Sequence, residues 1–281
     1  MWRPEQGGKP WRDWLPPART SRYVLRLGQA QFQLWQVAGR RLILQASRSV
    51  EHIGYNQFQA IANEVITLAQ ALPAGSGVQL LIDSKWMPLS LLTTGRAPLS
   101  NAQVQALALH RFGQTYGENA RGWQVQTNYV KGDAHALAFA CSAQLLSSLR
   151  QALGLDMPSP SRRTRLTGMQ PTFGWAWDQV QGREARSGDD WLMFAEQDRS
   201  IMARIAKGRV LALQPAGPIL RTPAQLASAL PSQARRCGLI EEGPYQALGV
   251  SLEPYPNRLL DTTVAEVRWH VIGTNESETP L

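Results

Sequence analysis

The chain has 281 residues, 43% of them hydrophobic, and a formal net charge of +8 at pH 7. This length and hydrophobic content allow a substantial buried core, which predicts one large or two closely joined globular domains. No stretch reaches the roughly 18 apolar residues of a membrane-spanning helix, and the two cysteines lack metal-ligand spacing. The sequence thus argues against a transmembrane protein, a disulfide framework and a zinc site.

The first 20 residues form a distinct segment with four prolines, three tryptophans and no helical or strand periodicity. We expect a flexible arm, in which Trp11, Arg12 and Trp14 are candidate partner-binding residues. The segment carries charge and proline where a secretory signal would have a continuous apolar run. This predicts a cytoplasmic protein.

Charge is distributed unevenly along the chain. Residues 1–50 hold nine Lys or Arg and two Asp or Glu, a net +7, whereas residues 241–281 hold two and seven, a net −5. Such asymmetry favours an acidic partner, an anionic membrane surface or nucleic acid near the N-terminal part. A basic face that is merely solvated is the alternative.

The first half predicts the order βββ-α-β-α-ββ-α. Strand-like runs at 23–28, 31–37 and 40–47 predict a three-stranded meander. An amphipathic helix over 56–72 follows, because apolar residues recur there at spacings of three and four. Next come a buried strand at 78–83, with 86–92 as its candidate neighbour, and a helix at 101–117 between Ser100 and Gly117. A hairpin at 122–130 and 135–141 and a helix at 142–154 complete this half.

The second half predicts another meander followed by a helix. After a polar, proline-containing link come a short strand at 165–170, a helix near 171–180 and strands near 191–196, 200–206 and 209–213. A helix at 222–238, which Pro231 is expected to kink or split, precedes closing strands at 245–252 and 264–273. We therefore expect an arm at 1–20, two related lobes at 21–160 and 161–273, and a polar tail at 274–281.

Motifs that would carry catalysis are scarce. The glycines at 73–79 lack the Gly-Lys-Ser/Thr of a P-loop, no nucleophile elbow occurs, and the four histidines are scattered. Asp83, at a predicted strand end, is either a catalytic carboxylate or the cap of a turn. Ten tryptophans and a basic composition suit nucleic-acid binding, but most of the tryptophans, such as Trp35 and Trp86, fall inside strand patterns or beside them. Nucleic acid is therefore the less favoured partner.

Two halves that each begin with a β-meander resemble the actin-like ATPases, which have a duplicated ribonuclease-H-like α/β fold with mixed sheets flanked by helices. Within that fold, the chain is similar to the PilM proteins of type IV pilus assembly and the cytoplasmic domain of the GspL proteins of type II secretion. The similarity is one of pattern and element order over most of residues 23–273.

The first nucleotide motif of this family is Asp-x-Gly in a hairpin, followed by a Lys. In LRLGQAQFQLWQV, Gly28 is kept, whereas Arg26 stands at the place of the Asp and Gln33 at that of the Lys. A nucleotide with bound Mg²⁺ needs a carboxylate nearby and backbone donors at its phosphates. Arginine reverses the charge at this position.

The second family motif, again Asp-x-Gly, corresponds to the hairpin near 191–206. Counting back from Lys207-Gly208-Arg209, Phe194 falls at the Asp and Glu196 at the Gly. A glutamate adds a Cβ and a negative charge where backbone must approach phosphate. Both sites are expected to be degenerate, so we expect a non-enzymatic protein without a nucleotide or metal cofactor.

The resemblance implies a scaffold in the assembly of a type IV pilus or a type II-like secretion machine. Its expected partner is the cytoplasmic tail of a bitopic inner-membrane protein, with an assembly ATPase as a second candidate and the basic arm as a peripheral membrane contact. Two alternatives remain: a divergent ATPase that uses Asp83 or Asp198, and a nucleic-acid-binding module that uses the arm.

Overall fold

The protein divides into an N-terminal unit of residues 4–38 and 43–172 and a C-terminal unit of residues 173–281, with which residues 1–3 and 39–42 are grouped. The computed structural model describes residues 23–38, 41–50, 53–54, 57–73, 75–95, 98–153, 164–178, 191–206, 209–217, 220, 223–236, 245–251 and 265–271. The predicted arm, with Trp11, Arg12 and Trp14, and the predicted tail lie outside these residues. Within the described residues, none of the helices has the length and hydrophobicity to cross a bilayer.

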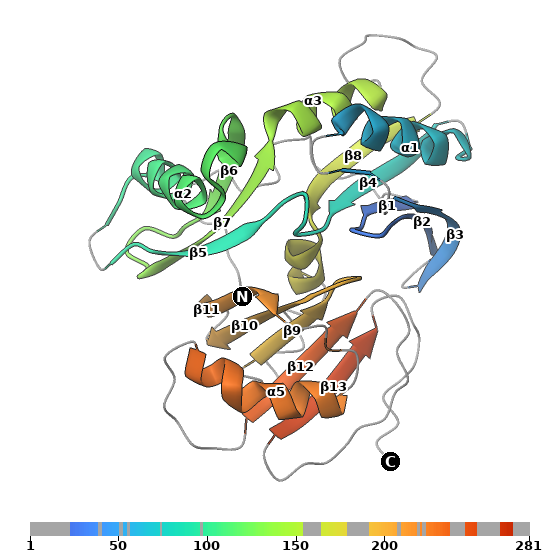
Figure 1. Ribbon diagram of the computed structural model, residues 1–281. Coiled ribbons are helices and arrows are strands. Elements are labelled where there is room, and N and C mark those ends of the chain that lie inside the picture. The colour runs from blue at the N-terminus through green and yellow to red at the C-terminus, as the bar shows by residue number, and fades with distance from the viewer. Residues whose placement is uncertain are drawn as a thin grey trace. The chain divides into compact units, whose positions relative to one another are not determined.

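A five-stranded mixed sheet forms the base of the N-terminal unit (Figure 1). Its strands are β1 (Tyr23–Leu27), β2 (Gln31–Ala38), β3 (Arg41–Ser49), β4 (Ser76–Ile82) and β8 (Thr164–Pro171), in the order β3-β2-β1-β4-β8. β1 runs antiparallel to β2 and parallel to β4, and β4 runs parallel to β8. Residues 24–27 of β1 are all buried, as expected for a central strand covered on both faces.

Two helices, α1 (Phe58–Gln70) and α3 (Ala143–Ala152), pack against each other in this unit. α1 buries Ile61, Val65 and Leu68, the stripe that the sequence pattern predicted. The predicted meander and the predicted helix near 56–72 are therefore confirmed.

A smaller antiparallel sheet of the same unit contains β5 (Leu89–Thr93), β6 (Trp123–Asn128) and β7 (His135–Ser142), in the order β5-β7-β6. The expectation that the segment 86–92 would pair with the strand at 78–83 was wrong, because β5 pairs with β7 instead. A short apolar run does not say which strand it joins. The predicted hairpin of β6 and β7 is confirmed.

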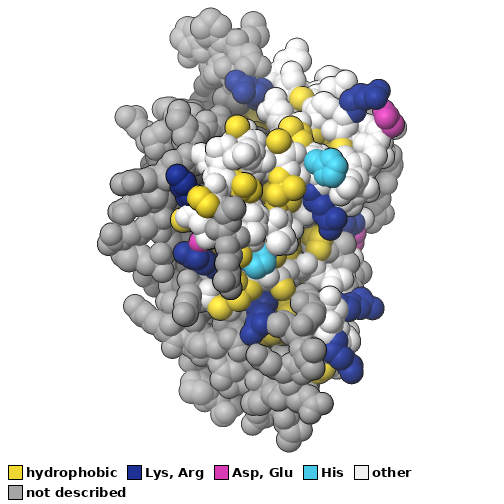
Figure 2. Space-filling model, turned by 90° about the vertical axis from the view of Figure 1, so that its left-hand side faces the viewer, with side chains coloured by type: hydrophobic (Ala, Val, Ile, Leu, Met, Phe, Trp, Pro, Cys, Tyr) yellow, Lys and Arg dark blue, Asp and Glu magenta, His cyan; other side chains and the backbone are white. Residues whose placement is uncertain are grey.

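The helix α2 (Asn101–Tyr116) covers this smaller sheet, and a 3-10 helix, η2 (Gly117–Ala120), follows it. Ser100 and Gln103 form a capping box at its start, and Gly117 ends it with φ +57°. Figure 2 looks onto the side of the molecule that carries α2, where apolar and basic side chains gather and acidic ones are few. The coloured part of this side thus has the positive character that the composition predicts.

The C-terminal unit holds the second five-stranded sheet. A helix at 172–178 leads into it, and its elements are β9 (Trp191–Ala195), β10 (Ser200–Ala206), β11 (Arg209–Gly217), α5 (Pro223–Arg236), β12 (Tyr245–Ser251) and β13 (Ala265–Val271). The strand order is β11-β10-β9-β12-β13. Trp191 and Met193 form a core with Leu226 and Leu230 of α5. α5 runs as one helix through Pro231, so the predicted split does not occur.

The two five-stranded sheets repeat one plan. Each begins with an antiparallel meander, and in each the first strand of the meander pairs in parallel with a strand that follows a helix. β1 therefore corresponds to β9, β3 to β11, α1 to α5 and β8 to β13. The duplication inferred from the sequence is confirmed.

The strand β8 belongs to the first of these sheets. From the sequence, we expected the second lobe to begin at residue 161 and therefore to contain β8. In the structure, β8 instead pairs with β4 of the N-terminal sheet. The N-terminal unit consequently extends to Thr172. The hydrophobic pattern predicts that such a strand exists but not which sheet it completes.

Candidate functional site

Polar side chains collect at the carboxyl ends of β1, β4 and β8. In open α/β sheets this end of the parallel strands is where ligands bind. Register places Gln33, Arg26, Leu81 and Gln170 in one row across β2, β1, β4 and β8. All four are buried. The candidate site of the first motif therefore lies inside the unit, and its positively charged member needs an internal partner.

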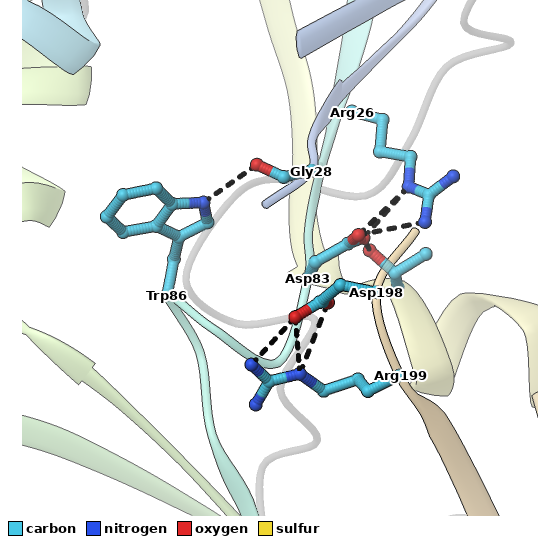
Figure 3. A network of polar contacts seen from close by, with 7 residues as sticks. Arg26, Gly28, Asp83, Trp86, Asp198 and Arg199 are labelled. Atoms are coloured by element: carbon cyan, nitrogen blue, oxygen red, sulfur yellow. Dashed lines mark hydrogen bonds and ion pairs between the residues drawn. The ribbon is translucent and has the colours of Figure 1, made fainter. Parts of the chain in front are cut away.

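That partner is Asp83, directly after β4. Arg26 Nε donates to Asp83 Oδ1 at 2.9 Å, and Arg26 Nη2 donates to Oδ2 at 2.8 Å (Figure 3). Both side chains are 1% exposed. Thr172 Oγ1 donates to Asp83 Oδ1 at 2.7 Å. A bidentate pair with a further hydroxyl donor satisfies much of the carboxylate's hydrogen-bonding capacity and leaves it poorly placed to serve a metal ion.

Asp83 also organises the turn that follows β4. Its carbonyl accepts hydrogen bonds from the backbone N–H groups of Trp86 and Met87 at 3.0 and 2.9 Å. Of the two roles left open by the sequence, the structure shows this turn-forming one, in addition to the ion pair. Catalysis by Asp83 remains an untested expectation.

The turn between β1 and β2 presents its carbonyl groups to protein donors. Leu27 O accepts from Asp83 N–H at 3.0 Å, and Ala30 O accepts from Val50 N–H at 2.8 Å. Between them, the carbonyl of Gly28 accepts from the indole Nε1 of Trp86 at 3.0 Å (Figure 3). A phosphate-binding turn needs convergent N–H groups instead. The hydrogen bonding of this turn therefore suits a structural hairpin better than a phosphate cradle.

Two side chains of the turn after β4 hold the hairpin in place. Trp86 is 1% exposed. Lys85 Nζ lies 4.3 Å from the centre of the Trp86 ring and 3.4 Å from the carbonyl oxygen of Gln29. The indole packs against the hairpin backbone while the ammonium group binds its outer carbonyl.

At the position of the motif's Asp, the second hairpin has an apolar side chain, Phe194, whereas the first has the charged Arg26. Phe194, the penultimate residue of β9, is fully buried and pairs with Ile201 of β10 and Val250 of β12. Glu196 follows β9 and is 2% exposed. No carboxylate stands at the Phe194 position, so this hairpin lacks the acid of an Asp-x-Gly motif.

Asp198, the other carboxylate considered for an ATPase, lies on the same turn. It pairs with the adjacent Arg199, whose Nη2 is 3.0 Å from Asp198 Oδ2, and both side chains are a little over one quarter exposed, at 28% and 29% (Figure 3). Solvent screens such a pair. Asp198 is thus the more accessible of the two candidate acids.

The two hairpins have the same register. Gly28 N–H donates to Gln31 O at 3.1 Å, and Glu196 N–H donates to Arg199 O at 2.9 Å. Each turn residue comes two positions after the residue assigned to the motif's Asp. Arg26 and Phe194 are therefore structurally equivalent, as are Gly28 and Glu196, and no inserted residue separates the two halves at this point.

Other sites for chemistry are few in the described part of the chain. No group of three or more His, Cys, Asp or Glu side chains there could hold a metal ion. Cys141 in β7 is buried, and desolvation raises the pKa of its thiol from 9.0 to about 12, with a hydrogen bond to the Ser142 backbone acting in the opposite direction. A thiol with so high a pKa is a poor nucleophile at neutral pH.

Comparison with known proteins identifies the fold. No protein-family model and no curated protein matches the sequence. Among solved structures, the PilM–PilN type IV pilus biogenesis complex aligns at 13% identity with a TM-score of 0.53, over 83% of this chain and 82% of the other. A Bacteroides thetaiotaomicron protein described as having an actin-like ATPase fold and unknown function aligns at 12% identity and a TM-score of 0.50, over 84% of each chain.

The chain has the actin-like ATPase fold. The cytoplasmic domain of EpsL, an inner-membrane component of the Vibrio cholerae type II secretion system, also aligns, at 13% identity and a TM-score of 0.47, over 90% of each chain. The predicted fold class, a duplicated α/β architecture, is confirmed, and so is the structural similarity to a pilus protein. In this example of the actin-like ATPase fold, the two motif hairpins contain Arg26 and Phe194.

Three residues around the first hairpin were not expected from the sequence. No sequence motif pointed to Thr172 or Lys85, and Trp86 stood out only as a tryptophan beside a strand pattern. The sequence feature that could have revealed them is their place directly after a parallel strand. Asp83-Ser84-Lys85-Trp86 follows β4, and Thr172 follows β8. Because the ends of parallel strands converge, residues at these two places were candidates for contact with Arg26.

Proposed function

We propose that this protein is a non-catalytic scaffold in the assembly of a type IV pilus or a type II-like secretion machine. The buried Arg26–Asp83 pair is the observation that carries the non-catalytic part. An actin-like nucleotide site uses carboxylates near the metal ion, and here one position is a cation and the nearby acid is bound to it. The apolar Phe194 in the second hairpin supports the same conclusion.

Protein partners are the second part of the proposal. The PilM–PilN structure is a complex of two type IV pilus biogenesis proteins, and the fold of this chain resembles it. We infer that this protein likewise acts through a partner, the cytoplasmic tail of a bitopic inner-membrane protein, and that it works at the cytoplasmic face of the membrane. An assembly ATPase is the second candidate partner.

Calorimetric titration with Mg-ATP tests the non-catalytic part. Full-length protein is expected to release no binding heat at micromolar protein and nucleotide and to hydrolyse no ATP. Micromolar or tighter binding with turnover would overturn this part. In that case Asp83→Asn and Asp198→Asn discriminate between the two acids of the ATPase alternative, since the substitution of the metal-binding acid abolishes turnover.

Co-purification tests the scaffold part. The partner to co-express is a bitopic inner-membrane protein encoded next to this one. We expect a complex that survives gel filtration equally well with and without Mg-ATP. Failure to form the complex, or a complex that requires nucleotide, would contradict the proposed role.

A further inference from the structure

We propose that β3 is a docking edge, at which an extended acidic segment of another protein adds a sixth strand to the N-terminal sheet. This inference identifies a surface and a class of ligand, and it holds whichever machine the protein serves. It rests on the position of β3, on its exposed side chains, on a comparison with its counterpart β11, and on charge.

The strand β3 lies at one end of the order β3-β2-β1-β4-β8, and in the described part of the sheet its neighbour is β2 (Figure 1). It is nine residues long, which exceeds the mean strand length of about five to six residues. The outer side of an edge strand carries N–H and C=O groups that are not bonded within the sheet. Such a row is a template for pairing with another extended chain.

Side chains of β3 make this edge apolar at its centre. Ile43 is 46% exposed and Leu44 is 47% exposed. Adjacent residues of a strand point to opposite faces of the sheet, so apolar surface is available on both faces beside this edge. An added strand would cover Ile43 with one set of its side chains and Leu44 with the other.

The equivalent strand β11 provides an internal comparison. β11 contains Pro215 near its C-terminal end, and proline lacks a backbone N–H group. The pairing of β11 with β10 also has two register shifts. Prolines and bulges are the usual means by which proteins protect an edge from pairing. β3 has the sequence RLILQASRS, without proline. Of two edges built on one plan, β3 is the one without a proline.

Charge indicates what kind of segment binds. β3 contains two arginines and no acidic residue, and its Arg48 is exposed. A second copy of the chain would bring the same strand and a further net charge of +8, which disfavours self-pairing. An extended segment with apolar residues opposite Ile43 and Leu44 and an acidic residue near Arg48 complements the edge in both respects.

The experiment uses full-length protein and a synthetic nine-residue probe, labelled for fluorescence anisotropy, that has valine at the positions opposite Ile43 and Leu44 and glutamate at the position opposite Arg48. We expect saturable binding that Arg48→Glu weakens at least tenfold. The matched control is Arg209→Glu on β11, which should change affinity less than twofold. Leu44→Thr on β3 and Leu211→Thr on β11 form a second pair that removes apolar surface without changing charge.

Backbone pairing is tested separately. A probe that is N-methylated at every second residue keeps its charge but cannot form the strand ladder, and it should bind at least tenfold more weakly. Hydrogen exchange should slow in residues 41–49 when the unmodified probe binds. Equal effects of the β3 and β11 substitutions, equal binding of the methylated probe, or protection elsewhere would overturn the proposal. Concentration-dependent self-association that Leu44→Thr abolishes would assign the edge to a second copy instead.

Discussion

Arg26 and Asp83 are 57 positions apart in the chain, yet their side chains form a bidentate ion pair that is almost completely shielded from solvent. The pair joins the central strand β1 to the end of β4. Charges buried at such a depth persist only when they neutralise each other, because removal of either one leaves the other desolvated and uncompensated.

Replacing Arg26 with Met should destabilise the protein by about 3–5 kcal/mol, the usual cost of leaving one partner of a buried pair alone. The double variant Arg26→Met with Asp83→Asn should recover part of that loss, since no net charge stays buried. Urea denaturation followed by circular dichroism measures both. Arg121→Ala is the control, because its pair with Glu118 is about 80% exposed and should contribute little. Equal losses for the two Arg variants would contradict the assignment.

Replacing Trp86 with Phe should cost about 1–2 kcal/mol, because the Gly28 carbonyl loses its indole donor while most of the packing is kept. The matched control is Trp35→Phe. Trp35 is also buried, but its indole nitrogen makes no hydrogen bond within the described structure. The two variants remove the same ring atoms, so the difference between their unfolding free energies reports on the hydrogen bond. A smaller loss for Trp86→Phe than for Trp35→Phe would contradict the role given to Trp86.

Cys141 predicts a stability change at high pH. In the unfolded chain its thiol ionises near the ordinary pKa of 9.0, whereas in the folded chain the pKa is about 12. The folded state therefore retains a proton that the unfolded state loses, and stability falls as pH rises between these values. The slope is at most about 1.4 kcal/mol per pH unit. The unfolding free energies of the wild type and Cys141→Ala should be measured between pH 8 and 10. We expect the wild type to lose stability relative to the variant as pH rises. The same pH dependence of unfolding free energy in both proteins would exclude this linkage.

Replacement by alanine should have opposite effects on stability at two glycines, Gly113 and Gly217. Gly113 lies inside α2, and a Cβ there meets nothing within 4 Å, so Gly113→Ala should stabilise the protein by about 0.5–1 kcal/mol. At Gly217, a Cβ would lie 3.0 Å from the Ser200 carbonyl oxygen, and Gly217→Ala should lower stability because two backbone segments must separate. Thermal denaturation of both variants gives the signs. A stabilising Gly217→Ala would show that β11 can move away from Ser200.

The sequence predicted the fold well because periodicity reports on burial. The stripe of α1, the Ser100 cap of α2 and the two meanders are local patterns, and the structure confirms them. The partners of β5 and β8 could not be predicted in this way, since each is a short apolar run that suits either sheet. Pairing depends on contacts between distant segments, which a pattern within one segment does not specify.

The candidate site shows the same division. The replacement of acidic residues by Arg26 and Phe194 can be read directly from the sequence. The Arg26–Asp83 pair, the Thr172 donor and the cover provided by Trp86 could not, because they bring together three strand ends from separate parts of the chain. The sequence left Asp83 as either a catalytic carboxylate or the cap of a turn, and its ion pair with Arg26 is visible only in the folded structure.

The place of β8 in the N-terminal sheet also governs how the chain can fold during synthesis. Until residues 164–171 have left the ribosome, β4 has no β8 to pair with and is an edge strand of the sheet. Asp83 gains its hydrogen bond from Thr172 only after that. Contacts across so long a stretch of chain form slowly, and an unpaired parallel strand invites aberrant association meanwhile. The N-terminal unit is thus synthesised first, but it can complete its sheet only when its last strand has been made, directly before the C-terminal unit begins.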